Sequence, residues 1–543
     1  MMSFVINKNF LKLLTSLSAP LWLCLLILVL FPAALKSYKF LGVLHFASKS
    51  HYIVGSSLLK ALANKGHEVT VVTSFTEQKP IKNYNEIHLK SVLKIMDEKT
   101  DELLETNRNS LLTNIMSFHQ MGLRLTDIVL NDPNVQSLIT SNQTFDAVIC
   151  EVFLGEALYG LSEHFKAPLI GLGTFGAISW NTDMVGSPSP PSYVPYPLLP
   201  LTDHMSFWER LGNLAVITFE RIFLDLYYLP RQSELYRKYF PHLEKSMLNV
   251  RRSAALVLLN THYSLTFTRP YVPNQIEVGG MHIKPSSPPY SKDLVDFIDN
   301  ASEGVIYFSM GSNIKSKKIP LTKREEILNA FRQLKQKVLW KFEDPYLTNK
   351  PDNVLIRDWF PQDFILAQPQ VKAFVTHGGL LSIQETVFYG KPIVALPIFG
   401  DQFLNAAISE REGFGIVLDY KNLTSIQLKT AIERVVNDKQ YKEKAEIMSV
   451  RFKDRPEHPM EKALFWVEFV AKHKGARFLH CAGVNLNFIE YHNLDAIFVL
   501  YIVSPFFIFL QLWIMYKLIV FCFSYCLIGK ISKKLKKDKL KKR

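Results

Sequence analysis

Residues 374 to 402 constrain the fold of this chain more than any other stretch. The apolar run up to Thr376 is typical of a buried parallel strand, and Gly378 and Gly379 then turn the chain into a helix that runs to about Tyr389. A second apolar strand follows this helix. A strand, a glycine turn and a helix place unpaired backbone N–H groups at the carboxyl edge of a sheet, where an anion is favoured. The stretch therefore predicts an α/β fold with an anion site.

The polar side chains of this stretch come in the order in which a nucleotide sugar would meet them. His377 lies in the glycine turn and Ser382 in the first helical turn, so both can donate hydrogen bonds to phosphate oxygens. Glu385 lies about one turn further on the same helix face and suits the two hydroxyls of a ribose. Asp401 and Gln402 open the next helix at the same sheet edge and offer an acceptor and an amide to a sugar. This order predicts a nucleotide-sugar site.

The stretch resembles the signature of the UDP-glycosyltransferases of the glucuronosyl/glucosyl-transferase family. In that family the histidine and the serine hold the diphosphate, the glutamate holds the ribose and the Asp-Gln pair holds the sugar. The resemblance therefore implies that His377 and Ser382 bind the diphosphate, together with the helix N-terminus at Gly379. The roles of the glutamate and of the Asp-Gln pair follow in the same way.

Two upstream segments extend the resemblance. Trp359 and Gln362 lie in Asp-Trp-Phe-Pro-Gln, which is similar to the family's uracil-stacking tryptophan and the Pro-Gln step after it. Ser309, Gly311 and Ser312 lie in a segment that resembles the loop with further phosphate donors. The resemblance runs from about residue 40 to the C-terminus. It implies two Rossmann-like domains that face a cleft, the architecture called GT-B, and a UDP-sugar as co-substrate without a further cofactor.

Transfer of a glycosyl group to a hydroxyl needs a base that removes the proton of the acceptor. His51 follows a serine after the first expected strand, and the family's catalytic histidine follows a serine at this place. His45 and His67 lie closer to strands and are expected to be structural. The carboxylate that orients the histidine is an aspartate in the family and is Glu151 here, one methylene longer, with Glu156 as the alternative.

Three other chemistries find little support. No D-x-D sequence occurs, so the usual carboxylate clamp for a divalent cation is missing and a metal-independent mechanism is expected. Cys150 and Cys481 are too few and too far apart for a disulfide framework, and no clustered ligands indicate zinc. Gly171 to Gly176 spells G-x-G-x-x-G, but the chain leads on to prolines instead of a helix, which argues against a dinucleotide site.

Strands alternate with helices over most of the chain, which predicts parallel sheets. An N-terminal acceptor-binding domain is expected at residues 37–284 and a C-terminal UDP-sugar domain at residues 285–490. The expected N-terminal strands are Phe40–Phe46, His67–Thr73, Phe145–Cys150, Pro168–Leu172 and, as the last, Ala255–Asn260. The expected C-terminal strands before the motif are Val305–Ser309, Val338–Phe342 and Val354–Ile356. Met460–His473 resembles the family's closing helix, which returns across the N-terminal half.

Met205 to Leu229 forms an unusually apolar helical stretch. One interpretation is a helix of the domain core. The other is a hydrophobic wall for the acceptor or a patch that rests on a bilayer. The sequence leaves both interpretations open.

The C-terminal region predicts a membrane anchor. Residues 496–516 form a run of 21 residues without a charge, which as a helix spans roughly 31 Å against a hydrocarbon core of about 30 Å. Residues 517–543 form a basic tail, which places that side of the span in the cytosol. Residues 1–36 carry lysines ahead of an apolar stretch and are expected to be a signal peptide. These features predict a single-pass type I protein with a luminal body.

Lys539 and Lys541 resemble a dilysine retrieval signal of the endoplasmic reticulum, with attraction to the membrane surface as the alternative. Sequons at Asn142, Asn300 and Asn422 suit glycosylation in the lumen. The net charge of +14 does not indicate a nucleic-acid partner, because residues 530–543 carry +8 of it and leave +6 on the rest.

Together these features predict a membrane-anchored enzyme that transfers a hexose from a UDP-sugar to a hydroxyl of a small lipophilic acceptor with inversion, as in detoxification or metabolite conjugation. Phrases such as Glu-Val-Phe-Leu at residues 151–154 resemble the arthropod branch of the family, which favours UDP-glucose over UDP-glucuronate. The alternative is a non-catalytic membrane-tethered relative that acts as a binding or regulatory partner. A sterol- or lipid-building transferase would differ only in its acceptor, and homo-oligomerisation is left open.

Overall fold

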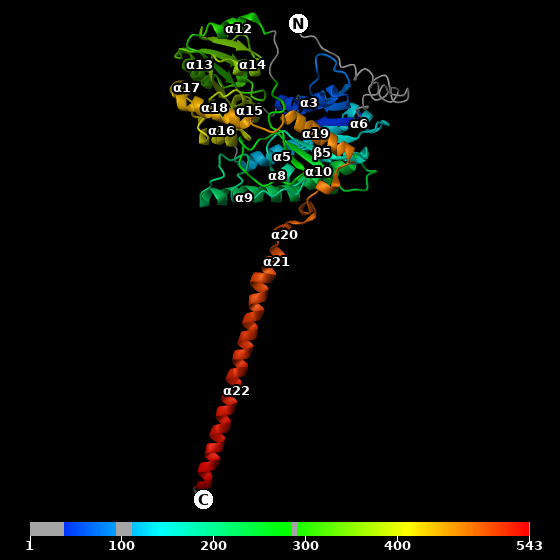
Figure 1. Cartoon of the computed structure of the whole chain (residues 1–543), viewed down its shortest axis with the longest axis vertical. Coiled ribbons are helices and arrows are strands. Elements are labelled where there is room, and N and C mark those ends of the chain that lie inside the picture. Colours follow the sequence, from blue (N-terminus) through cyan, green and yellow to red (C-terminus); the bar gives the residue numbers. More distant parts are fainter. Residues whose placement is uncertain (1–36, 94–110, 285–289, 542–543) are drawn as a thin grey trace, which may run out of the picture. The chain divides into compact units, whose positions relative to one another are not determined.

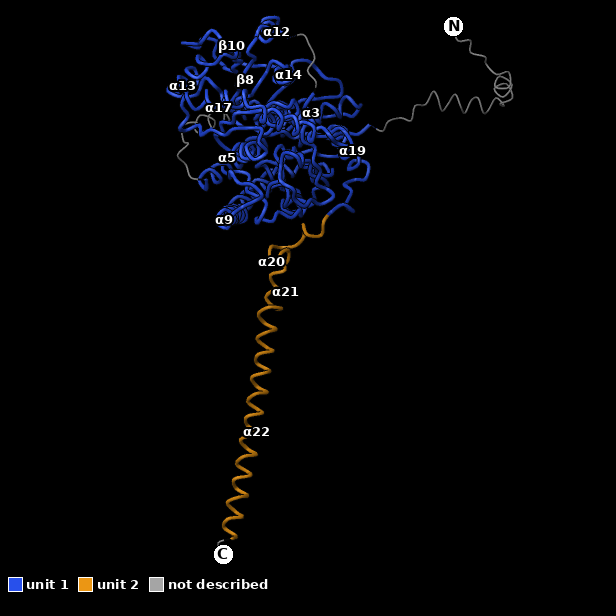
Figure 2. Tube along the Cα trace, turned by 60° about the vertical axis from the view of Figure 1, so that its left-hand side comes forward, with its two compact units in different colours: residues 1–480 blue, residues 481–543 orange. Residues whose placement is uncertain are grey.

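The computed structural model describes residues 37–93, 111–284 and 290–541, which fall into two compact units (Figure 2). Unit 1 is Met1–His480 and holds two parallel β-sheets, whereas unit 2 is Cys481–Arg543 and is helical. The expected signal peptide, residues 1–36, and the proline-rich junction at residues 285–289 lie outside the described residues.

The first sheet holds seven parallel strands in the order β3-β2-β1-β4-β5-β6-β7. β1 pairs with β2 on one side and with β4 on the other, so the direction in which strands are added reverses between β1 and β4. Val43 lies opposite Cys150 in this central pair. The strands are β1 (Lys39–Leu44), β2 (Glu68–Thr73), β3 (Tyr84–His88), β4 (Ala147–Glu151), β5 (Leu169–Gly173), β6 (Leu256–Leu259) and β7 (Gln275–Glu277).

The second sheet repeats this order with six parallel strands, β10-β9-β8-β11-β12-β13. Its reversal lies between β8 and β11, where Ser309 is opposite Thr376. The strands are β8 (Val305–Ser309), β9 (Lys337–Lys341), β10 (Val354–Arg357), β11 (Val371–Thr376), β12 (Ile393–Ala395) and β13 (Gly415–Val417). The predicted α/β class with two Rossmann-like sheets is therefore confirmed.

Helices connect the strands of both sheets (Figure 1). In the N-terminal half they are α3 (Lys49–Asn64), α5 (Leu111–Asn131), α6 (Pro133–Ile139), η1 (Glu156–Tyr159), α7 (Gly160–His164), α8 (Ser179–Thr182), α9 (Phe207–Phe223), the π-helical η2 (Leu224–Tyr228), α10 (Leu229–Tyr239) and α11 (Met247–Arg252). In the C-terminal half they are α12 (Lys292–Asp299), η3 (Ser316–Lys318), α13 (Leu321–Arg332), α14 (Gln362–Ala367), α15 (Leu380–Phe388), α16 (Gln402–Arg411), α17 (Ser425–Asn437), α18 (Lys439–Lys453), α19 (Pro459–Lys472) and η4 (Arg477–Leu479).

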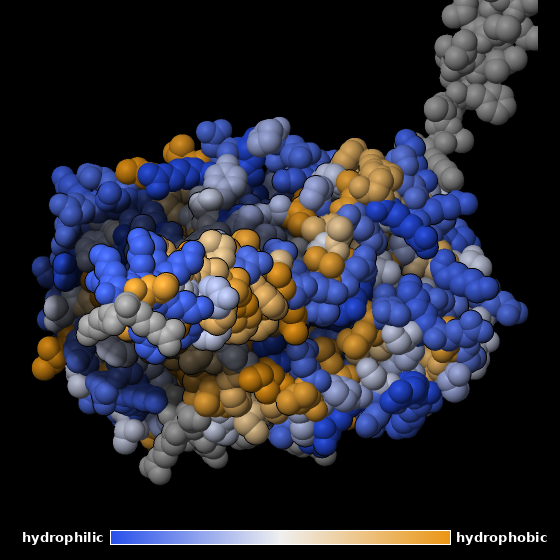
Figure 3. Space-filling model, turned by 90° about the horizontal axis from the view of Figure 1, so that it is seen from below, coloured by the Kyte–Doolittle hydropathy of each residue, from blue (hydrophilic) through white to orange (hydrophobic). Residues whose placement is uncertain are grey.

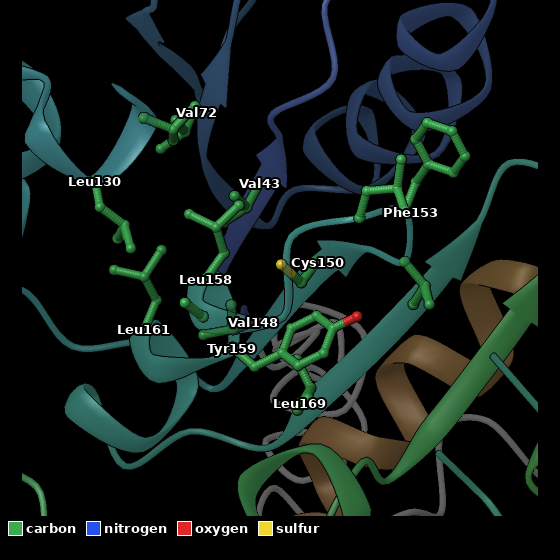
Figure 4. Close-up of a cluster of buried hydrophobic side chains, with 14 of the residues drawn as sticks. Val43, Val72, Leu130, Val148, Cys150, Phe153, Leu158, Tyr159, Leu161 and Leu169 are labelled. Carbon is green, nitrogen blue, oxygen red and sulfur yellow. The ribbon is translucent and has the colours of Figure 1, made fainter. Parts of the chain in front are cut away.

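The core of the N-terminal half is built on strands that are apolar along almost their whole length. All five residues of β4 are buried, which is typical of a strand covered by helices on both faces. Figure 4 shows Val148 and Cys150 of this strand in one cluster with Val43 of β1 and Tyr159 of η1. The near-continuous apolar character of such strands made them recognisable in the sequence.

Buried contacts join the N-terminal and C-terminal halves of unit 1. α19 returns to the N-terminal half as expected, where Leu464 shares a buried cluster with Phe40 of β1. The buried amide of Gln384 on α15 donates through Nε2 to the carbonyl oxygen of Asn260 at 2.9 Å and accepts through Oε1 from the backbone N–H of Gly280 at 3.0 Å. Both polar atoms of this amide are therefore used in contacts between the two halves.

The expectation that Ala255–Asn260 is the last strand of the N-terminal half is wrong. β7 follows β6 and pairs with it, and β3 and β13 were also not predicted. All three lie at the edges of their sheets and have only three to five residues. An edge strand pairs with a neighbouring strand on one side only, and strands as short as these leave a weak sequence signal.

The stretch from Met205 to Leu229 is helical as expected, but the interpretation as a core helix is wrong. It forms α9 and η2, and most of the large apolar side chains of α9 face outward, whereas Leu224 and Tyr228 of η2 are buried. Trp208 is 74% exposed and Leu226 is 77% exposed.

Unit 2 contains, among the described residues, one helix that is long and apolar enough to cross a membrane. It runs from Leu494 to Lys541 through α21 (Leu494–Phe498), the π-helical η6 (Val499–Val503) and α22 (Ser504–Lys541). The short elements η5 (Ala482–Asn485) and α20 (Phe488–Tyr491) precede it. The helix continues past Lys517, where the uncharged run ends. A helix with these properties is consistent with membrane anchoring.

The glycine that follows β7 gives a test of packing at the junction of the halves. A Cβ on Gly279 would lie 2.6 Å from the backbone carbonyl carbon and oxygen of Thr261. Since backbone atoms cannot move aside as a flexible side chain can, Gly279→Ala should lower the free energy of unfolding by about 1–3 kcal/mol. Thermal unfolding of the purified variant and the parent measures this loss.

Gly212, inside α9, is the matched control for this substitution. No atom lies within 4 Å of a Cβ built there, so Gly212→Ala should raise the free energy of unfolding by up to about 1 kcal/mol through helix propensity. Equal melting temperatures for the two variants would contradict the packing at Gly279.

Candidate active site

A cavity of about 510 Å³ is lined by residues from both halves of unit 1. His51 lines it, as do all the residues that the sequence suggested for the UDP-sugar. Glu151 is fully buried and does not reach the cavity surface. The lining residues of the suggested set are Ser309, Gly311, Ser312, Trp359, Gln362, His377, Gly379, Ser382, Glu385, Asp401 and Gln402.

The reversal of strand order in each sheet explains why these residues meet. β1 leads into the first turn of α3, which carries His51, and the neighbouring β4 ends at Glu151. In the second sheet β8 ends at Ser309, and the neighbouring β11 leads directly to His377. The connections on the two sides of such a reversal run in opposite directions, so they leave a crevice at the carboxyl ends of the strands.

His51 is held by a buried carboxylate. Its Nδ1 forms a hydrogen bond with Glu151 Oε1, and Thr174 Oγ1 lies 3.1 Å from the same nitrogen and 3.4 Å from the same oxygen. The backbone N–H of Phe46 donates to Glu151 Oε2 at 3.3 Å. The longer side chain of glutamate therefore still reaches the imidazole. Because Nδ1 is engaged, Nε2 is the ring nitrogen left for a substrate.

The other candidates for this pair have hydrogen-bond partners of their own, and His45 Nδ1 also lies 3.9 Å from Glu151 Oε2. Glu156 is buried and accepts a hydrogen bond from the Tyr228 hydroxyl at 2.7 Å. His45 Nε2 lies 2.8 Å from a backbone carbonyl oxygen, and burial lowers the pKa of this histidine. His67 is hydrogen-bonded to Glu468 of α19 at 2.9 Å. Both histidines lie in structural contacts, as the sequence suggested.

Two glycines make room for the imidazole of His377. A Cβ on Gly311 would lie 2.4 Å from this ring, and one on Gly379 would lie 2.5 Å from it. Gly378, between the histidine and the helix, has a φ of +84°, which glycine adopts readily. Burial, and then the nearby Lys341 ammonium, lower the pKa of His377 to about 4. The ring is therefore neutral near pH 7 and can donate one N–H to an anionic oxygen.

Glu385 is positioned by side chains from two other segments. Its Oε2 accepts a hydrogen bond from Gln362 Nε2, and its Oε1 lies 3.4 Å from His282 Nε2. Gln362 Nε2 also lies 3.3 Å from Ser382 Oγ. Burial, and then the charge of Glu385, raise the pKa of Asp363 to about 6. This concentration of carboxylates suits a group with several hydroxyls that donate hydrogen bonds.

Asp401 and Gln402 open α16 and face the same cavity. Gln402 Oε1 accepts from the backbone N–H groups of Ile398 and Phe399 at 2.8 and 3.1 Å, which leaves its Nε2 free to donate. Asp401 Oδ2 accepts from Asn405 Nδ2 at 3.0 Å. Burial raises the pKa of Asp401 to about 6, against the opposing influence of this hydrogen bond and of the His51 charge. A carboxylate of one half thus lies within electrostatic reach of the histidine of the other.

The part of the cavity that the N-terminal half lines is mostly apolar, and two polar groups interrupt it. Glu220 of α9 accepts from the Tyr196 hydroxyl at 2.7 Å and from two further donors. His119 of α5 donates through Nδ1 to the carbonyl oxygen of Ile115 at 2.7 Å, and its buried Nε2 has no hydrogen-bond partner among the described residues. The apolar lining includes Ile53, Ile115, Phe118, Met121, Phe153, Phe175, Ile178, Trp180 and Leu198.

Lys341, Thr174, His282 and His119 belong to the cavity but were not predicted. Lys341 is the one lysine or arginine among the described residues that line it. Its Nζ lies 2.5 Å from Glu343 Oε1 and 5.7 Å from the ring centre of Trp359. Its position at the end of β9, the same sheet edge as the motif, was the signal that could have found it. The other residues lie in segments without a motif.

Other predicted features are described by their exposure and contacts. Asn142, Asn300 and Asn422 are exposed, as a glycosylation site requires. Cys150 and Cys481 are both free thiols. Within residues 37–93, 111–284 and 290–541, no group of three or more His, Cys, Asp and Glu side chains is placed to hold a metal ion.

Comparison with known proteins gives matches along most of the chain. The family model "UDP-glucoronosyl and UDP-glucosyl transferase" matches residues 42–534. The chain is 35% identical over 475 residues to "UDP-glycosyltransferase UGT5" of Dactylopius coccus, over 85% of this chain and 88% of that protein. It is 34% identical over 522 residues to "UDP-glucosyltransferase 2" of the same organism, over 95% and 99% of the two chains. The solved structure of CalG4, the calicheamicin glycosyltransferase, aligns with a TM-score of 0.56 and 19% identity over 81% of this chain and 99% of that one, which shows a shared GT-B fold.

The raised pKa of Asp401 predicts a pH-dependent gain in stability for Asp401→Asn. The native carboxyl keeps its proton up to about pH 6, whereas the unfolded chain releases it near the ordinary value of 3.8. Ionisation of the buried group therefore opposes folding above about pH 6, on the order of 2–3 kcal/mol, and this cost falls as the pH decreases from 6 to about 4. The gain in melting temperature should be largest above about pH 7 and should disappear near pH 4. Thermal unfolding across this pH range measures it.

The exposed Asp352 supplies the control, because Asp352→Asn removes a carboxylate that is already hydrated. Its melting temperature should follow that of the parent at every pH. A gain for Asp401→Asn that is the same at every pH would contradict the assignment of a buried, proton-holding carboxyl.

Proposed function

The chain belongs to the UDP-glucuronosyl and UDP-glucosyl transferase family and is a UDP-glycosyltransferase, and on this premise we propose that it transfers a neutral hexose, with glucose preferred, to the hydroxyl of a small lipophilic acceptor. One observation carries the proposal: the histidine of one half and the suggested sugar-binding pair of the other line a single cavity. Such a reaction conjugates metabolites or foreign compounds.

In the proposed reaction His51 is the general base. Its Nε2 takes the proton of the acceptor hydroxyl while the hydroxyl oxygen attacks the anomeric carbon of the sugar. The bond from this carbon to the UDP oxygen breaks, and UDP leaves with the electron pair. Attack from the side opposite the leaving group inverts the anomeric carbon. Glu151 stabilises the imidazolium, since its carboxylate already engages Nδ1.

The proposed donor site spreads the charge of the leaving UDP over several donors. His377, Ser382 and the helix N-terminus at Gly379 face the diphosphate. The low pKa of His377 supports its role as a neutral imidazole that donates one N–H to an anionic oxygen. Trp359 is 51% exposed and offers the face of its indole to the uracil. Ser309, Gly311 and Ser312 complete the phosphate loop, and Glu385 binds the ribose in this proposal.

Electrostatics near the sugar support a neutral hexose. Asp401 would oppose a sugar carboxylate by about 1 kcal/mol at 4 Å even with water-like screening. Lys341, the one lysine or arginine of the lining among the described residues, is already paired with Glu343 and lies beside Trp359, the proposed uracil platform. A uronic acid would therefore meet a carboxylate without a dedicated cation.

The shape of the acceptor region supports an elongated lipophilic acceptor. The ring centroids of His51 and Phe153 are 5.2 Å apart, those of Phe153 and Trp180 are 5.3 Å apart, and those of Trp180 and His119 are 5.5 Å apart. This row of rings leads from the proposed base to His119. A flat apolar molecule with the reacting hydroxyl at one end would lie along the row.

We also propose the topology and the domain limits that the sequence suggested. The acceptor domain comprises residues 37–284 and the donor domain residues 285–490. The body lies in the lumen of the endoplasmic reticulum and the tail from residue 517 in the cytosol. The exposure of the three sequons and the apolar C-terminal helix support this topology.

The roles of His51 and Glu151 predict three distinct losses of activity. His51→Ala should lower kcat for an aliphatic alcohol by about 10²–10⁴-fold, since the proton then has no base. Glu151→Gln should be severe and Glu151→Asp mild, because the first removes the charge and the second changes only the reach. Turnover of an aliphatic alcohol by the three variants, with UDP affinity measured alongside, tests these roles.

UDP affinity is the internal control, because the proposed UDP contacts lie in the other half and should survive His51→Ala unchanged. A nitrophenol should partly rescue His51→Ala, since its more acidic hydroxyl loses its proton with less help. Full activity of His51→Ala on the aliphatic alcohol would contradict the mechanism. Near-normal activity of Glu151→Gln would remove Glu151 from the orienting role.

The donor proposal predicts that UDP-glucose is used in preference to UDP-glucuronate, by several-fold or more, in a competition assay with one acceptor. Free UDP should inhibit both reactions with the same inhibition constant, because the nucleotide contacts are common to both. A preference for UDP-glucuronate would overturn the choice of a neutral hexose while leaving the family assignment intact.

A further inference from the structure

α9 is an inverted amphipathic helix, and η2 continues it with Leu226 exposed and with Leu224 and Tyr228 packed in the core. Figure 1 shows α9 along the lower edge of unit 1, and Figure 3 looks at the molecule from that side and shows apolar side chains among the polar ones. Six large apolar side chains of these elements face outward, with exposed fractions of 47% to 77%. We call them the outer face: Phe207, Trp208, Leu211, Leu214, Ile222 and Leu226.

The side of this helix that faces the protein is polar where it is most buried. Asn213 is fully buried, accepts from the backbone N–H of Tyr196 at 2.7 Å and donates to the carbonyl oxygens of Pro191 and Val194. Glu220, seven residues further, is 2% exposed and accepts from three side-chain donors. An ordinary surface helix buries its apolar side chains and exposes its polar ones. α9 does the opposite, so water is not the medium that its outer face fits.

The spacing of the outer face shows that it is one continuous stripe. Its members recur at intervals of one, three, four and eight residues, which keeps them on one side of a helix. None of them is charged. Arg221, at the border of the stripe, is held by Asp183 and by Asp225, the latter at 3.0 Å, so this charge is also neutralised. A charged protein partner would find no complementary groups on the stripe.

The same chain supplies a medium that matches this stripe. Unit 2 begins at Cys481, and the helix that can cross a membrane begins at Leu494, so a short segment tethers unit 1 to any bilayer that the helix crosses. A short tether keeps the bilayer at a high effective concentration around unit 1. Phe207 and Trp208 at the start of α9 are of the aromatic type that favours the membrane–water interface.

We propose that the outer face of α9 and η2 inserts into the interface of the bilayer that the C-terminal helix crosses, as a second membrane contact. The helix lies in the plane of the interface, with its apolar side chains roughly 5–10 Å deep in the boundary between head groups and acyl chains. Its buried polar face, with Asn213 and Glu220, holds it to the rest of unit 1. The contact is apolar, so it does not depend on anionic lipids.

The test separates this contact from the tether. A recognition sequence for a site-specific protease is inserted into the full chain between Cys481 and Asn493. The protein is reconstituted into phosphatidylcholine vesicles, and the outward-facing molecules are cleaved. Flotation on a density gradient then shows whether the released unit 1 stays with the vesicles. We expect it to float with them, and to do so equally at low and high salt, because the contact carries no charge.

The decisive variant carries Trp208→Glu and Leu226→Glu. It should lower the vesicle-bound fraction of the released unit at least about tenfold, since interfacial binding scales with the apolar area that is inserted. The matched control carries Leu321→Glu and Ile426→Glu, whose parent side chains are 70% and 73% exposed in the other half. It should float like the parent. Both should keep the turnover of a water-soluble phenol, which shows that they are folded.

Three outcomes would overturn the proposal. The first is release of the parent unit 1 into solution on cleavage, and the second is equal flotation of the Trp208 and Leu226 variant. The third is a dimer of the cleaved unit in vesicle-free solution that the Glu substitutions abolish, which would assign the outer face to a second copy of the chain. If the charged variant fails to fold, Trp208→Ser with Leu226→Ser carries the same test.

Discussion

The reversal of strand order at the centre of each parallel sheet is the constraint on which the rest of the molecule depends. Strands added in opposite directions from β1 and from β8 force their connections apart, and the carboxyl ends of the central strands are left open. His51 and Glu151 lie at one such opening, and His377 lies at the other. The buried Gln384 amide joins the halves, so the two openings line one cavity.

Burial in this cavity shifts the pKa of several of its groups. The same loss of hydration lowers the pKa of His377 and raises those of Asp363 and Asp401, because burial destabilises the charged form of each group. A neutral imidazole faces the expected diphosphate, whereas carboxylates near their pKa face the expected hydroxyls. Because these groups are already partly dehydrated, little further hydration free energy is lost when a polyhydroxylated anion replaces water in the cavity. Their burial lowers the stability of the empty protein.

The cost of burying a polar group also explains which side of the surface helix α9 faces the protein. Asn213 and Glu220 are buried because each finds hydrogen-bond partners inside, and Trp208 and Leu226 are exposed because no core residue meets them. Glu220 also lines the cavity, so one helix separates the proposed bilayer contact from the acceptor region.

The sequence by itself determined the α/β class, the central strands and the residues of the nucleotide-sugar motif. Long apolar strands and a glycine turn are local signals, and His377, Ser382 and Glu385 lie within one strand–turn–helix unit. The edge strands β3, β7 and β13, the membership of His119 in the cavity, and the outward face of α9 came only from the tertiary structure. Each depends on which distant segments become neighbours, and neighbours far apart in the chain leave no periodic mark on either segment.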